Sequence, residues 1–394
     1  MGHYNLRRLH GPLLRPPGEC IHKKSSMQIQ RITVGEIKIP LKVPFKTALR
    51  TVADVHDLVL IVETDTGLRG FGEAPPTAVI TGDVLGSMRA ACDLIAPRLL
   101  GQDLSDFNAL LRTVHQSIQH HTSLKAALEI ALFDLRAQQF GVPLYQLLGG
   151  GVPRLKTDVT ISVNDTATML QDCLRAVGEG FDALKVKVGG RTWQDDVEST
   201  LAIARAVGPG VAIRLDANQG WSPKHAVQVI QALEKAGVVL EFVEQPVKAA
   251  DVAGLKFVTD NTLTPILADE AVFSVHDALH LLATNSADIV NIKLMKTAGI
   301  SQAIEIANLT RRHHKTCMMG CMLESGISVT AAAHFAVAFS DVVTTIDLDG
   351  PQLCSSNPLE GGLTMRGPWI ELSDAPGLGI TAVQGLTNTH TYEL

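Results

Sequence analysis

The chain has 394 residues and a formal net charge of −6, with 46% hydrophobic and 19% charged residues. This length suits two domains, or a barrel with an added domain, better than one small domain. The negative charge disfavours a nucleic-acid surface, which needs a basic patch, and no run of about 18 apolar residues is present that would cross a membrane.

The first 26 residues, MGHYNLRRLHGPLLRPPGECIHKKSS, are basic and show no hydrophobic period. They lack the continuous apolar run of a secretory signal. Alternation of apolar and polar residues begins only at Met27. We interpret residues 1–26 as a disordered extension, a cloning remnant or the result of an overcalled start codon, with an organelle-targeting segment as an alternative.

Residues 27–150 predict an α+β domain. The stretch VHDLVLIVETDTG followed by LRGFGEA is typical of strands joined by glycine turns. Residues 84–148 change to a helical period, since SLKAALEIALFDLRAQQFG has apolar residues at i, i+3 and i+4 and ends in glycine. This section is therefore expected to contain strands followed by helices.

From residue 151 onward, short β-rich runs alternate with helical stretches. The runs are TDVTISV, DALKVKVG, VAIRLDAN, LEFVEQP, TPILADE, DIVNIKL, KTCMMGCM and TTIDLDG. Eight strands that alternate with helices predict a parallel (β/α) barrel, which we assign to residues 151–352. Residues 353–394 are expected to return to the capping domain as a strand and a closing segment.

Polar residues recur in or at the end of each predicted barrel strand, 24 to 29 residues apart. Barrel enzymes place their chemistry at the C-terminal ends of the strands. Ordinary turn formation would explain one or two aspartates, but not two lysine-bearing strands and three carboxylates in register. The residues in this series are Thr160, Lys187, Asp216, Glu244, Asp269, Lys293, Cys321 and Asp347.

Three carboxylates, Asp216, Glu244 and Asp269, end three consecutive strands. Converging carboxylates repel each other and raise each other's pKa unless a cation is present. Oxygen ligands suit Mg²⁺, and the lack of His or Cys at these strand ends argues against Zn²⁺. Asn218 and Glu270 follow these ligands closely and either support them or only hydrogen-bond within their loops.

Lys185 and Lys187 lie two residues apart in ALKVKVG and therefore point to the same side of their strand. Helices cover the outside of a parallel barrel, so this side is the interior, although a lone strand lysine usually only extends to solvent. Two close ammonium groups disfavour each other's protonation, so one is expected to be a neutral amine and a general base. Lys293 lies four strands further on, across the barrel, where it would face the opposite side of a substrate.

The motifs KVKV, LDANQGW, VEQP, ADE and NIKLMKTAGI resemble the enolase superfamily, specifically its muconate-lactonising subgroup, from Met27 to about Ile380. The stretches PFKTALRTV, GEAPPTAVITGD, GCMLES and DLDGP resemble the dipeptide epimerases, in particular the L-Ala-D/L-Glu epimerases. The chain departs from the usual pattern at Thr297-Ala298-Gly299, where a glycine pair is usual, which concerns the local turn more than the chemistry.

The resemblance implies an α+β capping domain over a modified (β/α) barrel, with one Mg²⁺ per subunit on the three carboxylates. It implies that Lys187 and Lys293 are the two acid/base residues. Lys185 would contact the substrate carboxylate and depress the pKa of Lys187. Within this branch, the capping loop adjusts the choice of side chain.

Substrate recognition is assigned to the two ends of the pocket. Asp347 and Asp349 alternate on the last strand and would bind the ammonium group of a dipeptide. Arg50, which would otherwise be a surface charge, lies in the capping loop and matches a glutamate side chain with its planar fork. Thr160 and Cys321 would line the pocket, Cys321 through its backbone.

Together these features predict Mg²⁺-dependent epimerisation of L-Ala-L-Glu and L-Ala-D-Glu at the α-carbon of the second residue. Alternatives are another dipeptide specificity, muconate cycloisomerisation, o-succinylbenzoate synthesis and N-acylamino-acid racemisation. An acid-sugar dehydratase lacks support because no His–Asp pair ends strands six and seven. A Schiff-base enzyme would not need three carboxylates, and a protein that only binds ligands would not need both lysines.

The cysteines and the resemblance lead to expectations about the cellular compartment, the partners and the metabolic role of the protein. Six cysteines without CxxC spacing indicate reduced thiols in a cytoplasmic protein. The expected partner is a small dipeptide, and barrels of this class commonly form homo-oligomers. The resemblance also implies a role in recycling cell-wall peptides.

Overall fold

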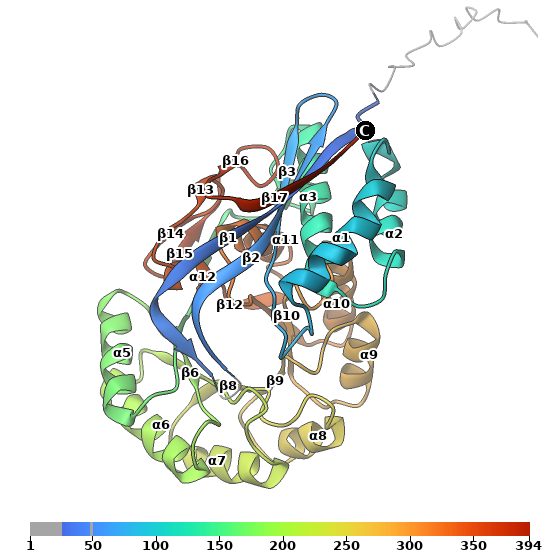
Figure 1. The fold of residues 1–394 in the computed structure, drawn as a ribbon. Coiled ribbons are helices and arrows are strands. Elements are labelled where there is room, and N and C mark those ends of the chain that lie inside the picture. The colour runs from blue at the N-terminus through green and yellow to red at the C-terminus, as the bar shows by residue number, and fades with distance from the viewer. Residues whose placement is uncertain (1–25, 48–49) are drawn as a thin grey trace, which may run out of the picture.

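The computed structural model describes residues 26–47 and 50–394, and within these ranges the chain forms a capping domain and a barrel (Figure 1). The extension expected at residues 1–26 lies outside the described residues, apart from its last residue. The described part of the chain contains no helix that is both long and apolar enough to cross a membrane. Its five described cysteines are free thiols.

The capping domain is an antiparallel sheet with helices packed on it. Among the described residues the sheet has four strands in the order β17-β1-β2-β3. Its N-terminal elements are β1 (Ile29–Lys46), β2 (Thr51–Thr64), β3 (Arg69–Ala74), α1 (Leu85–Leu99), the 3-10 turn η1 (Leu104–Asp106), α2 (Phe107–Gln116), α3 (Thr122–Phe140) and α4 (Leu144–Leu147).

Helix α3 packs on β3 without intervening side chains. A Cβ atom at Gly72 would lie 1.9 Å from the carbonyl oxygen of Ala127, and one at Gly70 would lie 2.1 Å from that of Ala131. Asp134 of α3 accepts a hydrogen bond from the backbone N–H of Phe71 at 3.1 Å. Glycine therefore permits the close approach of helix and strand that closes the capping core.

The barrel is a parallel sheet whose eight described strands lie side by side in chain order, which confirms the predicted fold class. Each strand is followed by a helix. The elements are β5 (Val159–Ile161), α5 (Thr166–Gly178), β6 (Ala183–Lys187), α6 (Trp193–Val207), β7 (Ala212–Asp216), α7 (Pro223–Lys235), β8 (Leu240–Glu244), α8 (Val252–Asp260), β9 (Ile266–Ala268), α9 (Val275–Ala283), β10 (Ile289–Ile292), α10 (Ile300–Arg312), β11 (Thr316–Gly320), α11 (Gly326–Ala338), β12 (Val343–Asp347) and α12 (Gly350–Leu353).

Two features make this barrel a modified one. Helix α12 has only four residues, whereas α11 has 13. The first and last strands, β5 and β12, are linked beside their ends by isolated bonds, from Asp158 N–H to the carbonyl of Ile346 at 3.4 Å and from Leu348 N–H to Oγ1 of Thr157 at 2.8 Å. The barrel is therefore nearly closed.

The C-terminal segment runs back over the capping domain. Strand β17 pairs antiparallel with β1, with Ile32 opposite Tyr392. Strand β14 pairs with β15, β15 pairs with β4, and β13 pairs with β16. The bounds are β4 (Arg154–Lys156), β13 (Leu359–Gly361), β14 (Thr364–Arg366), β15 (Trp369–Glu371), β16 (Ile380–Val383) and β17 (Thr387–Glu393).

Strands β1 and β2 extend beyond the capping sheet toward the barrel (Figure 1). At the end of β1, the N–H of Lys46 donates to Oγ of Ser162 at 3.2 Å, and its carbonyl accepts from the N–H of Val163 at 3.2 Å. Both partners follow β5 directly. The long hairpin therefore meets the C-terminal ends of the barrel strands, where the recurring polar residues lie.

Candidate active site

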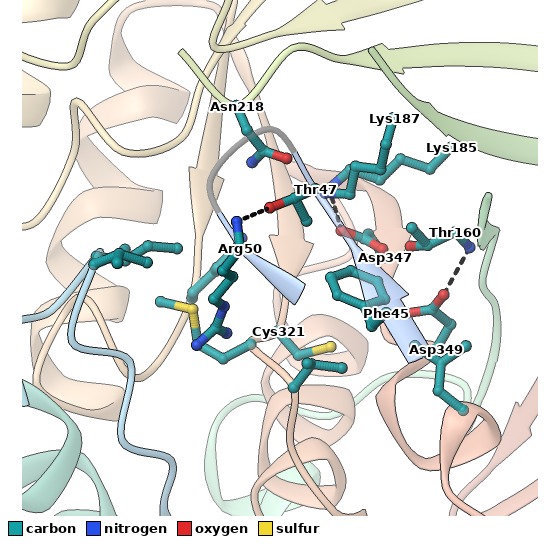
Figure 2. Close-up of a pocket in the computed structure, with 16 residues that line it drawn as sticks. Phe45, Thr47, Arg50, Thr160, Lys185, Lys187, Asn218, Cys321, Asp347 and Asp349 are labelled. Carbon is teal, nitrogen blue, oxygen red and sulfur yellow. Dashed lines mark hydrogen bonds and ion pairs between the residues drawn. The ribbon is translucent and has the colours of Figure 1, made fainter. Parts of the chain in front are cut away.

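A pocket with an empty volume of about 580 Å³ lies where the capping domain meets the C-terminal ends of the barrel strands (Figure 2). Capping and barrel residues both line it, and most of its polar lining comes from the strand ends. The lining residues are Phe45, Thr47, Arg50, Val79, Ile80, Thr160, Lys185, Lys187, Asn218, Lys293, Cys321, Met322, Leu323, Asp347, Asp349 and Leu353.

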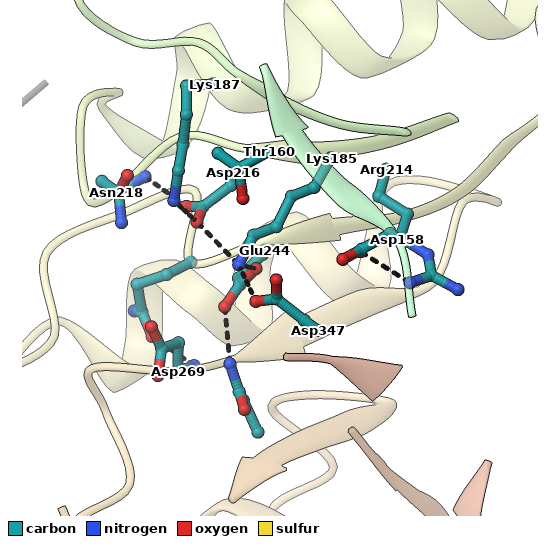
Figure 3. A network of polar contacts seen from close by, with 12 residues as sticks. Asp158, Thr160, Lys185, Lys187, Arg214, Asp216, Asn218, Glu244, Asp269 and Asp347 are labelled. Atoms are coloured by element: carbon teal, nitrogen blue, oxygen red, sulfur yellow. Dashed lines mark hydrogen bonds and ion pairs between the residues drawn. The ribbon is translucent and has the colours of Figure 1, made fainter. Parts of the chain in front are cut away.

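The two lysines of β6 point into the barrel, toward carboxylates from neighbouring strands (Figure 3). The Nζ atom of Lys187 lies 2.5 Å from Oδ2 of Asp216. The Nζ atom of Lys185 lies 2.6 Å from Glu244, 2.7 Å from Asp347 and 3.2 Å from Asp216. The buried ammonium groups are therefore matched by buried carboxylates, as buried charges require.

A second pair of lysines follows β10. The Nζ atom of Lys293 lies 2.9 Å from Oδ2 of Asp269, and that of Lys296 lies 2.6 Å from Oδ1. Lys296 also donates to the carbonyl oxygens of Asp269 and Asn291, at 2.5 and 2.9 Å. Lys296 was not among the predicted site residues, although the second lysine of NIKLMK follows two apolar residues, Leu294 and Met295, which is a signal of burial.

The pKa values of Lys185 and Lys293 shift upward, whereas repulsion between the two ammonium groups of the KVK motif would lower a lysine pKa. Burial lowers the pKa of Lys185, but Asp347, Glu244 and Asp216 outweigh it and raise that pKa well above its ordinary value. Burial also lowers the pKa of Lys293, and Asp269 reverses the effect, so the net shift is upward. At Lys185 and Lys293 the neighbouring carboxylates therefore outweigh both burial and like-charge repulsion.

The carboxylates respond in opposite ways to the same surroundings. Burial raises the pKa of Asp216, but Lys187 and Lys185 lower it to a net value of about 2. Burial, with Asp216 adding repulsion, raises the pKa of Glu244 to about 8. The raised pKa of Glu244 therefore indicates that the lysines do not fully neutralise the negative charge buried around it.

The donor atoms at the floor of the pocket suit a hard divalent cation in kind. Glu244 and Asp269 are buried, and Oε2 of Glu244 and Oδ1 of Asp269 each lie 2.6 Å from a lysine ammonium group, that of Lys185 and that of Lys296 respectively. All three expected ligands offer carboxylate oxygens, which Mg²⁺ prefers. Among the described residues no three His, Cys, Asp or Glu side chains are grouped closely enough to hold a metal as they stand. Lys185 lies within ion-pair distance of both Asp216 and Glu244, so a metal would have to displace its ammonium group.

Asn218 and Glu270 connect two of these strand ends. The N–H of Asn218 donates to Oδ1 of Asp216 at 2.9 Å, and its side-chain amide donates to Oε1 of Glu270 at 3.2 Å. Asn291 donates in the same way to Oε1 of Glu244 at 2.7 Å. These side chains orient the carboxylates, and Asn291 is a further residue that the sequence analysis missed.

The last barrel strand places two aspartates at one end of the pocket, although only one of them is on the strand. Asp347 ends β12, whereas Asp349 lies beyond it as the N-cap of α12, so the expected alternation of both on the strand is wrong. Oδ2 of Asp349 accepts from the N–H of Thr160 at 2.7 Å. Burial and the neighbouring Asp347 raise the pKa of Asp349 to about 6. Cys321 lies directly after β11, beside Gly350.

Arg50 belongs to the capping hairpin and lines the side of the pocket opposite Asp349 (Figure 2). Its backbone closes a turn with Thr47, since Thr47 N–H donates to the carbonyl of Arg50 at 3.0 Å and Arg50 N–H donates to Oγ1 of Thr47 at 3.2 Å. Burial lowers the pKa of Arg50, partly offset by Asp57. The sequence analysis missed Asp57, which is buried in β2 and whose Oδ2 accepts no hydrogen bond.

Two family descriptions match the chain. Residues 29–149 match the mandelate racemase / muconate lactonizing enzyme N-terminal domain, and residues 168–384 match the enolase C-terminal domain-like family. These ranges correspond to the capping domain and the barrel, and together they span most of the chain.

Several known proteins similar to this chain are epimerases. The L-Ala-D/L-Glu epimerase of Clostridium acetobutylicum is 46% identical over 91% of this chain and 99% of its own length. A substrate-liganded structure of the L-Ala-D/L-Glu epimerase from Bacillus subtilis superposes with a TM-score of 0.89 at 44% identity, covering 91% of this chain and 99% of that one. A dipeptide epimerase from Enterococcus faecalis, complexed with Mg and L-Leu-L-Tyr, gives a TM-score of 0.87 at 39% identity, over 90% of this chain and all of that one. This chain therefore belongs to the mandelate racemase / muconate lactonizing enzyme family of the enolase superfamily, and within it is an isomerase of the epimerase branch.

Proposed function

We propose that this protein is a Mg²⁺-dependent dipeptide epimerase that interconverts L-Ala-L-Glu and L-Ala-D-Glu at the α-carbon of the second residue. The observation that carries the proposal is the placement of Lys187 and Lys293. Both line the pocket, and they come from β6 and from the residue after β10, which are four strands apart in an eight-stranded barrel. A substrate between them would present one face of its α-carbon to each lysine.

In the proposed reaction, one lysine removes the α-proton and the other returns a proton to the opposite face. Each needs a carboxylate that holds its Nζ atom in place, and Asp216 and Asp269 serve this purpose at 2.5 and 2.9 Å. Lys185, paired with Asp347 at 2.7 Å, would place its positive charge beside the substrate carboxylate. The opposed pair makes the reaction reversible between the two epimers.

The residues that would hold Mg²⁺ are Asp216, Glu244 and Asp269. When bound there, the ion supplies positive charge that stabilises the negative charge developing on the substrate carboxylate as the α-proton leaves. Its charge would also offset the excess negative charge indicated by the raised pKa of Glu244. Structures of epimerases from E. faecalis and Cytophaga hutchinsonii were solved with Mg and dipeptides, which supports this assignment.

Specificity for the two ends of the dipeptide is assigned to charged residues at opposite ends of the pocket. Asp349 would accept the N-terminal ammonium group, because Asp347 is already paired with Lys185 at 2.7 Å. Arg50 would bind the glutamate side chain through its planar guanidinium. An anionic or N-acylated substrate would meet repulsion or an unpaired carboxylate at the Asp349 end, which disfavours the muconate and N-acylamino-acid alternatives.

The proposal is tested by deuterium incorporation at the α-carbon, measured by mass spectrometry in D₂O with Mg²⁺. Two dipeptide libraries, L-Ala-L-X and L-X-L-Glu, are compared for wild type and Arg50→Ala. We expect wild type to prefer L-Ala-L-Glu, and Arg50→Ala to reduce kcat/KM for it by about 100-fold, as loss of a buried charge-assisted pair costs about 2–3 kcal/mol.

L-Ala-L-Leu, which offers Arg50 no carboxylate, is the matched control substrate and should be affected far less. Exchange confined to apolar members of the L-Ala-L-X library, such as L-Ala-L-Leu, would retain the epimerase and refute the glutamate assignment. Absence of exchange on every dipeptide, with and without added Mg²⁺, would refute the proposed function.

A further inference from the structure

The N-terminus of barrel helix α10 is capped by a residue of the capping domain. Gly299, which precedes α10, has no side chain to cap it. Instead, Oε1 of Glu129, on α3, accepts from the N–H of Ser301 at 2.5 Å, and its Oε2 accepts from the Ser301 hydroxyl at 3.1 Å. Glu129 is fully buried, and His115 holds the same Oε2 at 2.5 Å. A carboxylate at a helix N-terminus is stabilised by the free N–H groups and the helix dipole.

The contact between the two domains is tight. Gly299 has φ = +126°, and a Cβ atom there would lie 2.6 Å from Cδ of Glu129. The preceding residue, Ala298, is also in the left-handed region, with φ = +57°. Such backbone conformations persist only where surrounding contacts hold them, and Glu129 supplies one such contact.

The turn held in this way is the one that carries Lys293. The N–H groups of Lys296 and Thr297 donate to the carbonyl of Lys293 at 2.9 and 3.1 Å. The Thr297 hydroxyl donates to the carbonyl of Gly299 at 2.9 Å, and Gly299 N–H donates to the carbonyl of Leu294 at 3.0 Å. The segment from Lys293 to Gly299 is therefore one hydrogen-bonded unit whose far end rests on Glu129.

The opposite lysine is held differently. Lys187 is the last residue of β6, where it pairs in register with Asp216 of β7, and the next residue, Val188, continues the ladder by donating to the carbonyl of Asp216 at 2.9 Å. Lys293 lies one residue beyond the end of β10, outside that ladder. The strand ladder thus fixes one lysine, while a turn anchored in the other domain fixes its counterpart.

We propose that Glu129 is a positioning residue for Lys293 alone, so that this contact from the capping domain acts on proton transfer at one face of the substrate and not at the other. This inference rests on the proposed two-lysine function. Its signature is stereochemical: loss of Glu129 slows reaction of one epimer more than that of the other, because only Lys293 is displaced.

The test measures α-proton exchange in D₂O separately for L-Ala-L-Glu and L-Ala-D-Glu. Lys187→Ala and Lys293→Ala first assign each epimer to its lysine, since each variant should retain exchange of only one epimer. In Glu129→Ala we expect kcat for the epimer served by Lys293 to fall about tenfold or more, since small misplacement of a catalytic group is costly. The other epimer should change by less than about threefold, and Glu129→Gln, which keeps an oxygen for Ser301 N–H, should recover part of the loss.

Glu73→Ala is the matched control. Glu73, also from the capping domain, caps α11 through the N–H groups of Ser325 and Ser328 at 2.9 and 3.0 Å. The strand before α11 bears no lysine of the pair, so this variant should affect both epimers alike. Should Glu129→Ala fail to fold, Ser301→Ala removes one of the two bonds and should give the same asymmetry, reduced in size.

Equal slowing of both epimers in the folded Glu129 and Ser301 variants, or no slowing, would overturn the positioning role. Failure of the proposed function gives a different result, because wild type itself would then exchange neither epimer. The two failures are therefore distinguished within one set of measurements.

Discussion

The buried charges of the site stabilise each other as a set. Lys185 contacts Asp216, Glu244 and Asp347, while Asp269 is shared between Lys293 and Lys296. Removing Lys185 would leave Glu244 and Asp347 each without its ion-pair partner, and breaking a buried pair in this way typically costs about 3–5 kcal/mol. At this scale, residues assigned to the proposed reaction also balance the buried charge at the barrel centre.

Not every buried titratable residue belongs to the site, and His334 gives a prediction for stability. It lies on α11 with 1% of its surface exposed, and its Nδ1 accepts from the N–H of Tyr145 at 3.0 Å. Burial lowers its pKa from 6.5 to about 4. The unfolded chain therefore binds this proton first, so stability supplied by neutral His334 is complete above pH 6.5 and is lost as pH falls toward 4, by about 3 kcal/mol.

The measurement is urea unfolding of wild type and His334→Gln between pH 4.5 and 7.5. The difference in unfolding free energy between the two should shrink as pH falls, because glutamine does not titrate. A pH-independent difference would contradict the assignment. Comparison with the variant is necessary because buried carboxyls such as Glu324, whose pKa burial raises to about 7, titrate in the same range with opposite sign.

At the scale of elements, the capping domain depends on direct contact between backbone atoms. Helix α3 lies on β3 through Gly70 and Gly72, and the same helix carries Glu129 toward α10. One side of α3 therefore packs on the glycines of β3, and its other side contacts barrel helix α10 through Glu129. Substitutions in β3 can reach the Lys293 turn by this route.

Gly72→Ala should lower the unfolding free energy by about 3 kcal/mol, at the upper end of ordinary overpacking, because its Cβ meets backbone that cannot move aside. The control is Gly86→Ala, in the first turn of α1, where a Cβ meets nothing within 4 Å. That variant should be neutral or stabilising by up to about 1 kcal/mol, since alanine favours a helix. Chemical denaturation of both variants decides the matter, and similar values for the two would refute the close-packing explanation.

At the scale of the whole molecule, the pocket is complete only when both domains are in place. Arg50 and Phe45 come from the capping hairpin, and the lysines and carboxylates come from the barrel. Caps from Glu73 and Glu129 join the domains at two successive barrel helices. Both domains therefore contribute side chains to the lining of the pocket.

Binding of Mg²⁺ should stabilise the whole molecule, because the folded state assembles the three carboxylates and the unfolded chain does not. At 100 times its dissociation constant, the ion would add about 2.7 kcal/mol and raise Tm by several degrees. Thermal unfolding with Mg²⁺ and with EDTA measures this shift. Asp216→Asn should abolish it, whereas Glu73→Ala should retain it. A wild-type Tm that does not respond to millimolar Mg²⁺ would contradict the metal assignment.

The fold class followed from the sequence because it depends on local, periodic signals. Eight apolar runs alternating with helical stretches are typical of a parallel barrel, and the polar series at 24 to 29 residues showed where each strand ends. The inward direction of Lys185 and Lys187 follows from the period of two in a strand. The location of Asp349 was wrong because a period cannot show that the strand stops at Asp347.

Contacts between segments that lie far apart in the chain could not be predicted from such local, periodic signals. Nothing local to Glu129 indicates that it caps a helix 170 residues later, and nothing local to Lys296 indicates that it shares Asp269 with Lys293. The pKa directions depend on such pairs, since whether burial or a carboxylate dominates is decided by distances between strands. Residue order and period thus specified the barrel, its strand ends and the type of chemistry, while the balance of charges and the contact between domains arise only when the strands and helices pack in three dimensions.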